Sequence, residues 1–133
     1  MIDSFRHKGL RKKLIDILSE KGIKDQRVLE AINKIPRHLF IDNAFLNFAY
    51  QDKAFPIGAG QTISQPYTVA FQTQLLEIFP YEKVLEVGTG SGYQAALLYL
   101  LETDVYTIER QKELFKKTKQ FLPTLGYNCK FFY

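Results

Sequence analysis

Residues 84–93 read Val-Leu-Glu-Val-Gly-Thr-Gly-Ser-Gly-Tyr, and residues 105–109 read Val-Tyr-Thr-Ile-Glu. The two segments predict a buried strand, a glycine-rich turn, a helix and a second strand that ends in the carboxylate of Glu109. Glycine lets a backbone approach a ligand because no Cβ intervenes, and a carboxylate at a strand tip can accept hydrogen bonds from ribose hydroxyls. The pattern is typical of the first half of a nucleoside-cofactor site in an open α/β sheet.

The details of the turn favour S-adenosyl-L-methionine over a dinucleotide. A dinucleotide fingerprint places a third glycine where this chain has Tyr93. Glu86 would lie unfavourably beside a pyrophosphate, but it suits a ligand with a sulfonium and an ammonium group. The alternative is a tight strand-to-helix turn without a ligand. The predicted cofactor-binding residues are Glu86, Gly88, Thr89, Gly90, Ser91, Gly92 and Glu109, and no metal site is predicted.

Composition limits the other possibilities. The chain has 133 residues, 46% of them hydrophobic, which is enough for one domain with a core. Its net charge is only +4, and the basic residues lie on segments with helical spacing, which is typical of a solvated helix face and not of a nucleic-acid footprint. The single cysteine, Cys129, suits a reducing compartment. Without a signal peptide or a long apolar run, we expect a cytoplasmic protein that binds neither nucleic acid nor membrane.

The pattern along the chain divides it into two regions within one structural domain. Residues 1–80 are expected to form an N-terminal helical and substrate-loop region, and residues 81–133 the first half of a Rossmann-like cofactor-binding domain. In the second region strands and helices alternate, as in the βαβαβ half of a doubly wound parallel sheet. The elements expected there are a strand from Lys83, a helix over 92–101, a strand over 105–109, a helix over 111–122 and a strand over 129–133.

The first region is expected to contain three helices and an extended loop. The helices cover residues 4–21, the segment from Asp25 to Pro36, and the segment from Pro66 to about Phe79; the loop covers residues 54–62. Helical spacing predicts that the following side chains face inward: Leu10, Leu14, Ile17 and Leu18 in the first helix, Val28, Leu29, Ile32 and Ile35 in the second, and Val69, Ala70, Leu75 and Leu76 in the third.

Residues 60–67, Gly-Gln-Thr-Ile-Ser-Gln-Pro-Tyr, form a second candidate site. Polar and apolar side chains alternate here just before a predicted helix start. A purely structural interpretation is that Ser64 caps the helix that begins at Pro66, because serine is a favoured cap.

Taken together, these motifs resemble the protein-L-isoaspartate O-methyltransferase family. The resemblance extends over about residues 5–133, and its most specific stretch is Gln-Thr-Ile-Ser-Gln-Pro at 61–66, which generic methyltransferases lack. It implies an α/β, Rossmann-like S-adenosylmethionine-dependent methyltransferase fold that methylates the free carboxylate of L-isoaspartyl residues in damaged proteins, a protein-repair reaction. The matching motifs are Pro-Arg-His-Leu-Phe at 36–40, Pro-Ile-Gly at 56–58, Gly-Gln-Thr-Ile-Ser-Gln-Pro at 60–66, and the segments 84–93 and 105–109.

The resemblance also implies roles for individual residues. Ser64 matches the family's active-site serine, and Thr62, Ile63 and Gln65 are the implied substrate-binding residues for isoaspartyl-containing proteins and peptides. The chemistry is consistent, because a carboxylate is ionised at neutral pH and needs no general base to attack a sulfonium methyl group. Ser64 would orient that carboxylate. His38 is expected to be structural.

Family members continue beyond the third strand, so we expect a chain truncated after that strand and an incomplete doubly wound sheet. The first strand would then have an open edge, which allows self-association. Two alternatives to the methyltransferase reading remain. One is a catalytically inactive remnant that binds cofactor or peptide weakly or associates through the open edge. The other is a methyltransferase with another substrate, such as nucleic acid, against which residues 61–66 argue.

Overall fold

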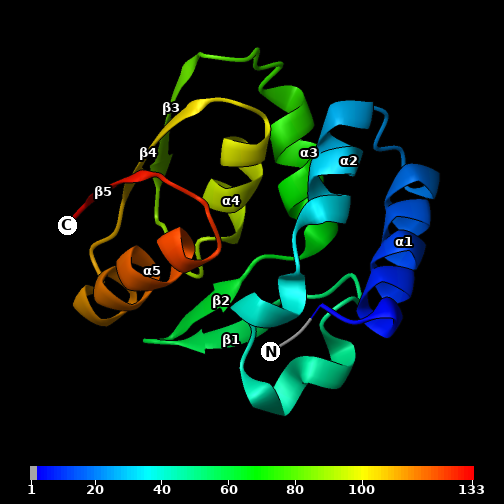
Figure 1. Cartoon of the computed structure of the whole chain (residues 1–133), viewed down its shortest axis with the longest axis horizontal. Helices are drawn as coiled ribbons and strands as arrows, with labels where there is room; N and C mark the ends of the chain where they lie inside the picture. Colours follow the sequence, from blue (N-terminus) through cyan, green and yellow to red (C-terminus); the bar gives the residue numbers. More distant parts are fainter. Residues whose placement is uncertain (1–2) are drawn as a thin grey trace.

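The computed structural model describes residues 3–133 and consists of an N-terminal helical region and a small parallel sheet. Figure 1 shows α1, α2 and α3 side by side, with α4 between them and the sheet. The α-helices are α1 (Phe5–Glu20), α2 (Gln26–Lys34), α3 (Pro66–Leu75), α4 (Tyr93–Leu100) and α5 (Lys112–Thr124). Two 3₁₀ helices are η1 (Arg37–Phe40) and η2 (Asn43–Phe48), and the strands are β1 (Phe55–Gly58), β2 (Gln61–Ile63), β3 (Lys83–Val87), β4 (Asp104–Ile108) and β5 (Lys130–Phe132).

The first two helices begin at side-chain caps. The Ser4 hydroxyl accepts a hydrogen bond from the His7 backbone N–H and starts α1, and the Asp25 carboxylate accepts one from the Arg27 N–H and starts α2. The inward face predicted for α2 is confirmed. In α1, Leu14 and Leu18 are buried as predicted.

One inward position of α1 was predicted wrongly. Ile17 is 39% exposed, whereas Arg11, which was assigned to a solvated helix face, is only 5% exposed. Burial of Arg11 is possible because its guanidinium donates to both Asp3 carboxylate oxygens, to the Tyr50 hydroxyl and to the Asn33 carbonyl. Hydrophobic spacing cannot identify a position whose burial depends on distant hydrogen-bond acceptors.

The expected loop over residues 54–62 is instead an antiparallel hairpin. Strands β1 and β2 pair with Phe55 opposite Ile63, and both of these side chains are buried. The two turn residues, Ala59 and Gly60, have φ values of 49° and 65°, as a type I′ hairpin turn requires. The proline and glycines that suggest a loop lie in this short, irregular strand pair. Ser64 follows directly after the second strand.

Helix α3 ends earlier than predicted, and its C-terminal apolar residues face outward. The helix stops at Leu75, and Glu77 adopts a left-handed φ of 48°. Val69 and Ala70 are buried as predicted, but Leu75 and Leu76 are 63% and 53% exposed. These two lie beyond the part of α3 that packs on the rest of the described chain.

The predicted βαβαβ unit is confirmed. Strands β3, β4 and β5 are parallel in that order, with Val84 opposite Val105 and Glu86 opposite Thr107. Helix α4 contacts β4 on the face where Val105 and Thr107 are buried. On the opposite face, apolar side chains remain exposed within residues 3–133: Leu85, Val87, Ile108 and Phe132. Strand β3 lies at the edge of this sheet, as expected.

The described helices include none with the length and apolar character needed to cross a lipid bilayer. The predicted domain division at residues 80/81 coincides with the passage from α3 to β3, and it stays a prediction.

The tightest packing contact of the turn after β3 gives a stability prediction. A Cβ on Gly92 would lie 2.7 Å from Thr118 Cγ2 and 2.9 Å from Leu122 Cδ1, at a φ of +82°. Gly126 has a similar φ of +85°, but a Cβ there would meet no atom within 4 Å. We expect Gly92→Ala to reduce the free energy of unfolding by about 1–3 kcal/mol more than Gly126→Ala, the usual cost of overpacking. Urea denaturation of both variants measures the difference, and equal losses would contradict the packing argument.

Candidate cofactor and substrate site

The turn between β3 and α4 forms the floor of the candidate site. Gly88, Gly90 and Gly92 have φ values of 96°, 53° and 82°, which residues with a Cβ rarely adopt. The N–H groups of Gly88 and Thr89 donate to the Ile108 carbonyl. The turn is therefore fixed to the carboxyl end of β4, next to Glu109.

Glu109 holds this turn from the side. The residue is 4% exposed, and its two carboxylate oxygens each accept a backbone hydrogen bond of 2.8 Å, one from Gly90 and one from Gln111. Each carboxylate oxygen has a second acceptor position. Glu109 can therefore hold the turn and still accept hydrogen bonds from a ligand.

The two candidate sites predicted from the sequence meet in one cleft. The cleft has a volume of about 520 Å³, within the usual range for small-molecule sites. One wall carries Thr62 and Ser64, and the other carries Gly88, Gly90 and Glu109. The remaining lining residues are Gln61, Val87, Ile108, Arg110 and Gln111.

A smaller recess of about 70 Å³ shares four residues with the cleft and contains most of the other predicted site residues. Ile63, Glu86, Thr89 and Ser91 line the recess but not the cleft, and Ile63 is otherwise buried in the core. Two predicted residues line neither space. Gly92 lies against α5, and the Gln65 side chain donates to Asp52.

Ser64 does not cap α3. The N-cap residue is Gln65, and no side chain caps the helix by a hydrogen bond. Ser64 is exposed and lines both the cleft and the recess. The interpretation that Ser64 only caps this helix is therefore wrong, and the residue lines space that a ligand could occupy.

Glu86 carries the most perturbed carboxyl group near the cleft. Its pKa is raised to about 7, chiefly by burial and also by the charge of Glu109, while a hydrogen bond from the Thr107 hydroxyl opposes the shift. Thr107 is in turn hydrogen-bonded to the Thr89 hydroxyl of the turn. The Glu86 carboxyl, which lies beside the glycine turn, is therefore partly protonated at neutral pH.

Two residues that support the Ser64 segment were not identified as functional from the sequence. The Arg37 guanidinium donates to the carbonyls of Ser64 and Lys53. The Asp52 carboxylate accepts hydrogen bonds from the Tyr67 N–H and from the Gln65 side chain. The run Pro-Arg-His at 36–38 was a signal for the first of these, but only the resemblance drew attention to it. His38 is buried, with Nδ1 2.7 Å from the Tyr50 hydroxyl, and its structural role stays a prediction.

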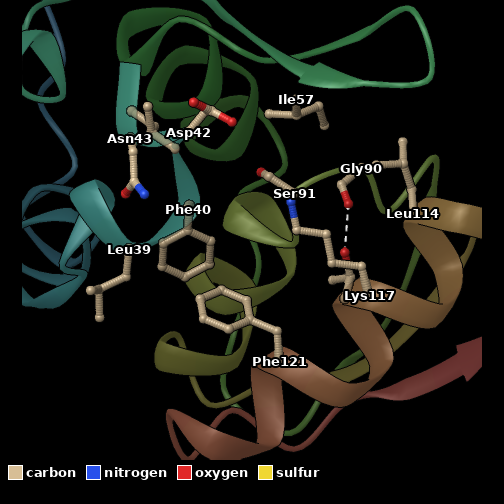
Figure 2. A pocket seen from close by; sticks show the side chains of 12 residues that line it. Leu39, Phe40, Asp42, Asn43, Ile57, Gly90, Ser91, Leu114, Lys117 and Phe121 are labelled. Atoms are coloured by element: carbon tan, nitrogen blue, oxygen red, sulfur yellow. Dashed lines mark hydrogen bonds between the residues drawn. The ribbon is translucent and has the colours of Figure 1, made fainter. Parts of the chain in front are cut away.

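Helix α5 supports the turn from behind, beside a second pocket of about 340 Å³ (Figure 2). The Thr118 hydroxyl donates a 2.7 Å hydrogen bond to the Gly90 carbonyl, drawn as the dashed line. Phe40 and Phe121 pack edge to face at 5.3 Å in the floor of this pocket. Gly90 is thus held on both sides, by α5 through its carbonyl and by Glu109 through its N–H.

Comparison with known proteins gives a consistent result. A family model described as Protein-L-isoaspartate(D-aspartate) O-methyltransferase matches residues 9–131. A protein-L-isoaspartate O-methyltransferase of Cytophaga hutchinsonii is 63% identical over 132 residues, which are 99% of this chain and 60% of the relative. One from Christiangramia forsetii is 64% identical over 131 residues, 98% of this chain and 62% of the relative. The chain thus spans about 60% of the length of these curated relatives.

Solved structures agree with this fold. A protein-L-isoaspartate O-methyltransferase structure matches with a TM-score of 0.81 at 27% identity, covering 92% of this chain and 41% of the other. A Plasmodium falciparum structure, described as a protein of the same kind in complex with S-adenosyl-L-homocysteine, has a TM-score of 0.73 at 22% identity and covers 92% and 62% of the two chains. The expected Rossmann-like methyltransferase fold is confirmed.

The pKa of Glu86 predicts how stability depends on pH. The folded pKa of about 7 lies above the ordinary value of 4.5, so the folded state keeps a proton that the unfolded state releases in between. The contribution of this group to the free energy of unfolding is therefore complete at low pH and is lost as pH rises through 7. We expect Glu86→Gln to remove this loss. Urea denaturation at about pH 5 and about pH 8 measures this change in the free energy of unfolding. The control is Glu30→Gln, at an exposed position. Identical pH profiles of wild type and Glu86→Gln would contradict the prediction.

Proposed function

The chain belongs to the protein-L-isoaspartate(D-aspartate) O-methyltransferase family, and from that membership we propose that it transfers a methyl group from S-adenosyl-L-methionine to the free carboxylate of L-isoaspartyl residues in damaged proteins. The observation that carries the proposal is the shared cleft between the Ser64 segment and the Glu109-held glycine turn. Because the chain spans about 60% of its curated relatives, its activity, substrates, partners and a cytoplasmic location are all parts of the proposal.

The residues of the cleft fit the proposed cofactor. A Cβ on Gly88 would meet no heavy atom within 4 Å, so this backbone faces open space that a side chain would fill. Glu109 would accept hydrogen bonds from the ribose hydroxyls, and Glu86 would lie near the positive charges. When bound, the cofactor would supply an electrophilic methyl group. The complex of the Plasmodium falciparum protein with S-adenosyl-L-homocysteine supports the choice of cofactor.

The Ser64 segment would hold the substrate. A carboxylate is ionised at neutral pH, so no side chain has to remove a proton from it. The Ser64 hydroxyl would donate to one carboxylate oxygen and leave the other aligned with the methyl group. Strand β2 pairs with β1 along one edge only, and its other edge would accept an extended substrate backbone next to Thr62.

Two substitutions test whether Glu109 binds the cofactor and Ser64 orients the substrate. Glu109→Ala should weaken binding of S-adenosyl-L-homocysteine by about 1–3 kcal/mol, the scale for losing hydrogen bonds to a charged group. Ser64→Ala should leave that binding unchanged and reduce methyl transfer to an isoaspartyl peptide. Isothermal titration and a radiolabel transfer assay measure the two effects. The control for Glu109→Ala is Asp104→Ala, which removes a more exposed carboxylate at the start of β4, the strand that Glu109 follows.

The outcomes separate the alternatives. Equal losses of binding and transfer in Ser64→Ala would make this residue structural. If folded wild-type chain binds no S-adenosyl-L-homocysteine, the inactive-remnant alternative replaces the proposed activity for this chain.

The open edge of β3 supports a further part of the proposal, self-association of the 133-residue chain. Leu85 is 64% exposed on this strand, and an unpaired apolar edge is a template for pairing with another chain. We expect concentration-dependent association in sedimentation velocity. Leu85→Lys should reduce it, because a charge on an edge strand opposes pairing. Phe5→Lys, at an apolar position of α1 that is 92% exposed, should not. A monomeric wild type at high concentration would disprove this part.

A further inference from the structure

Arg37 is a fully buried cation directly beneath the Ser64 segment. The residue is 0% exposed, and its Nη2 donates to the Ser64 carbonyl at 2.9 Å and to the Lys53 carbonyl at 3.1 Å. The Tyr93 ring lies against the guanidinium, with its centroid 4.7 Å from Cζ. Nε and Nη1 have no hydrogen-bond partner within residues 3–133. The guanidinium therefore bridges the chain on both sides of the β1–β2 hairpin.

No described ion pair neutralises this charge. The other buried arginine, Arg11, pairs with Asp3, whereas the ion pairs among residues 3–133 do not include Arg37. Asp52 is the carboxylate that acts on Arg37 through its charge, and it is engaged by the Lys21 ammonium. Burial lowers the pKa of Arg37, but an arginine side chain keeps its proton in proteins. A positive charge without an ion-pair partner among the described residues thus lies under the candidate site.

The hydrogen bond to Ser64 also orients the next peptide group. The described chain contains no cis peptide bond, and in a planar trans peptide the C=O and the N–H point in opposite directions. Because the Ser64 carbonyl points inward at Arg37, the Gln65 N–H points outward. This N–H has no acceptor among the described residues. It is therefore a donor without an internal partner, at the residue that follows Ser64.

We propose that Arg37 is a positioning residue that makes the Ser64 segment selective for a carboxylate over its neutral amide. It fixes the Ser64 carbonyl and so the position of Ser64, which lines the cleft and would donate its hydroxyl to one carboxylate oxygen. Its charge favours the anionic substrate and not the methyl ester, which is neutral. The inference rests on the proposed function and adds the residue that sets the substrate's charge. Arg37 acts on binding, so its loss affects KM more than kcat.

The test follows the Gln65 amide by NMR in the 133-residue chain. The probes are acetate, an isoaspartyl hexapeptide, and the same peptide with the isoaspartyl carboxylate converted to a primary amide. In wild type, acetate shifts the Gln65 resonance saturably, and the carboxylate peptide binds about tenfold more tightly than the amide, as expected for hydrogen bonds to a charged group. In Arg37→Met both effects disappear. Arg27→Met, which removes an exposed arginine from α2, leaves them unchanged.

Arg37→Lys keeps the positive charge and serves as the second variant if Arg37→Met does not fold. It retains a preference for the carboxylate peptide, reduced because an ammonium cannot reproduce the planar bridge between two carbonyls. A preference that survives in Arg37→Met, or an equal loss in Arg37→Lys and Arg37→Met, overturns the inference, as does a wild-type Gln65 amide that acetate does not shift. An Arg37-dependent acetate response without any peptide preference upholds anion selection by Arg37 and rejects the proposed substrate.

Discussion

The carboxylate of Glu109 is the constraint around which the site is organised. It lies at the end of β4, is almost fully buried, and uses both oxygens to hold backbone N–H groups of the glycine turn and of the start of α5. The turn needs such restraints, because three of its residues adopt left-handed φ values, and the Ile108 carbonyl and the Thr118 hydroxyl hold it as well. This arrangement fixes the turn as one wall of the cleft, whose other wall carries Thr62 and Ser64.

The sheet half of the fold could be predicted from the sequence because each of its signals is local. The apolar run before Gly88, the glycine spacing and the carboxylate after the next strand describe a strand, a turn and a strand without reference to distant residues. The helical half was less predictable because tertiary contacts decide it. Arg11 replaces Ile17 inside because Asp3, Asn33 and Tyr50 provide acceptors. The β1–β2 hairpin depends on burying Phe55 against the core.

The candidate site, too, could be predicted from the sequence only in part. The sequence indicated the residues that carry chemical groups, Ser64 and Glu109, and the fold brings both into one cleft. It did not indicate the residues that orient them. Arg37 acts through a backbone carbonyl, and a hydrogen bond to a carbonyl leaves no mark on the identity of residue 64. Asp52 acts through the N–H of Tyr67 in the same manner. Supporting residues of this kind become visible only with coordinates.

The contact between Gly92 and α5 constrains how the sequence can change over evolution. Thr118 touches the turn with its methyl group at Gly92 and with its hydroxyl at the Gly90 carbonyl. Serine at position 118 would keep the hydroxyl and remove the methyl group, and the flexible end of Leu122 can rotate away. Serine at position 118 would therefore lower the steric part of the cost of a larger residue at position 92, and the strain of the φ of +82° would remain. Substitutions at the two positions are thus coupled through one packing contact.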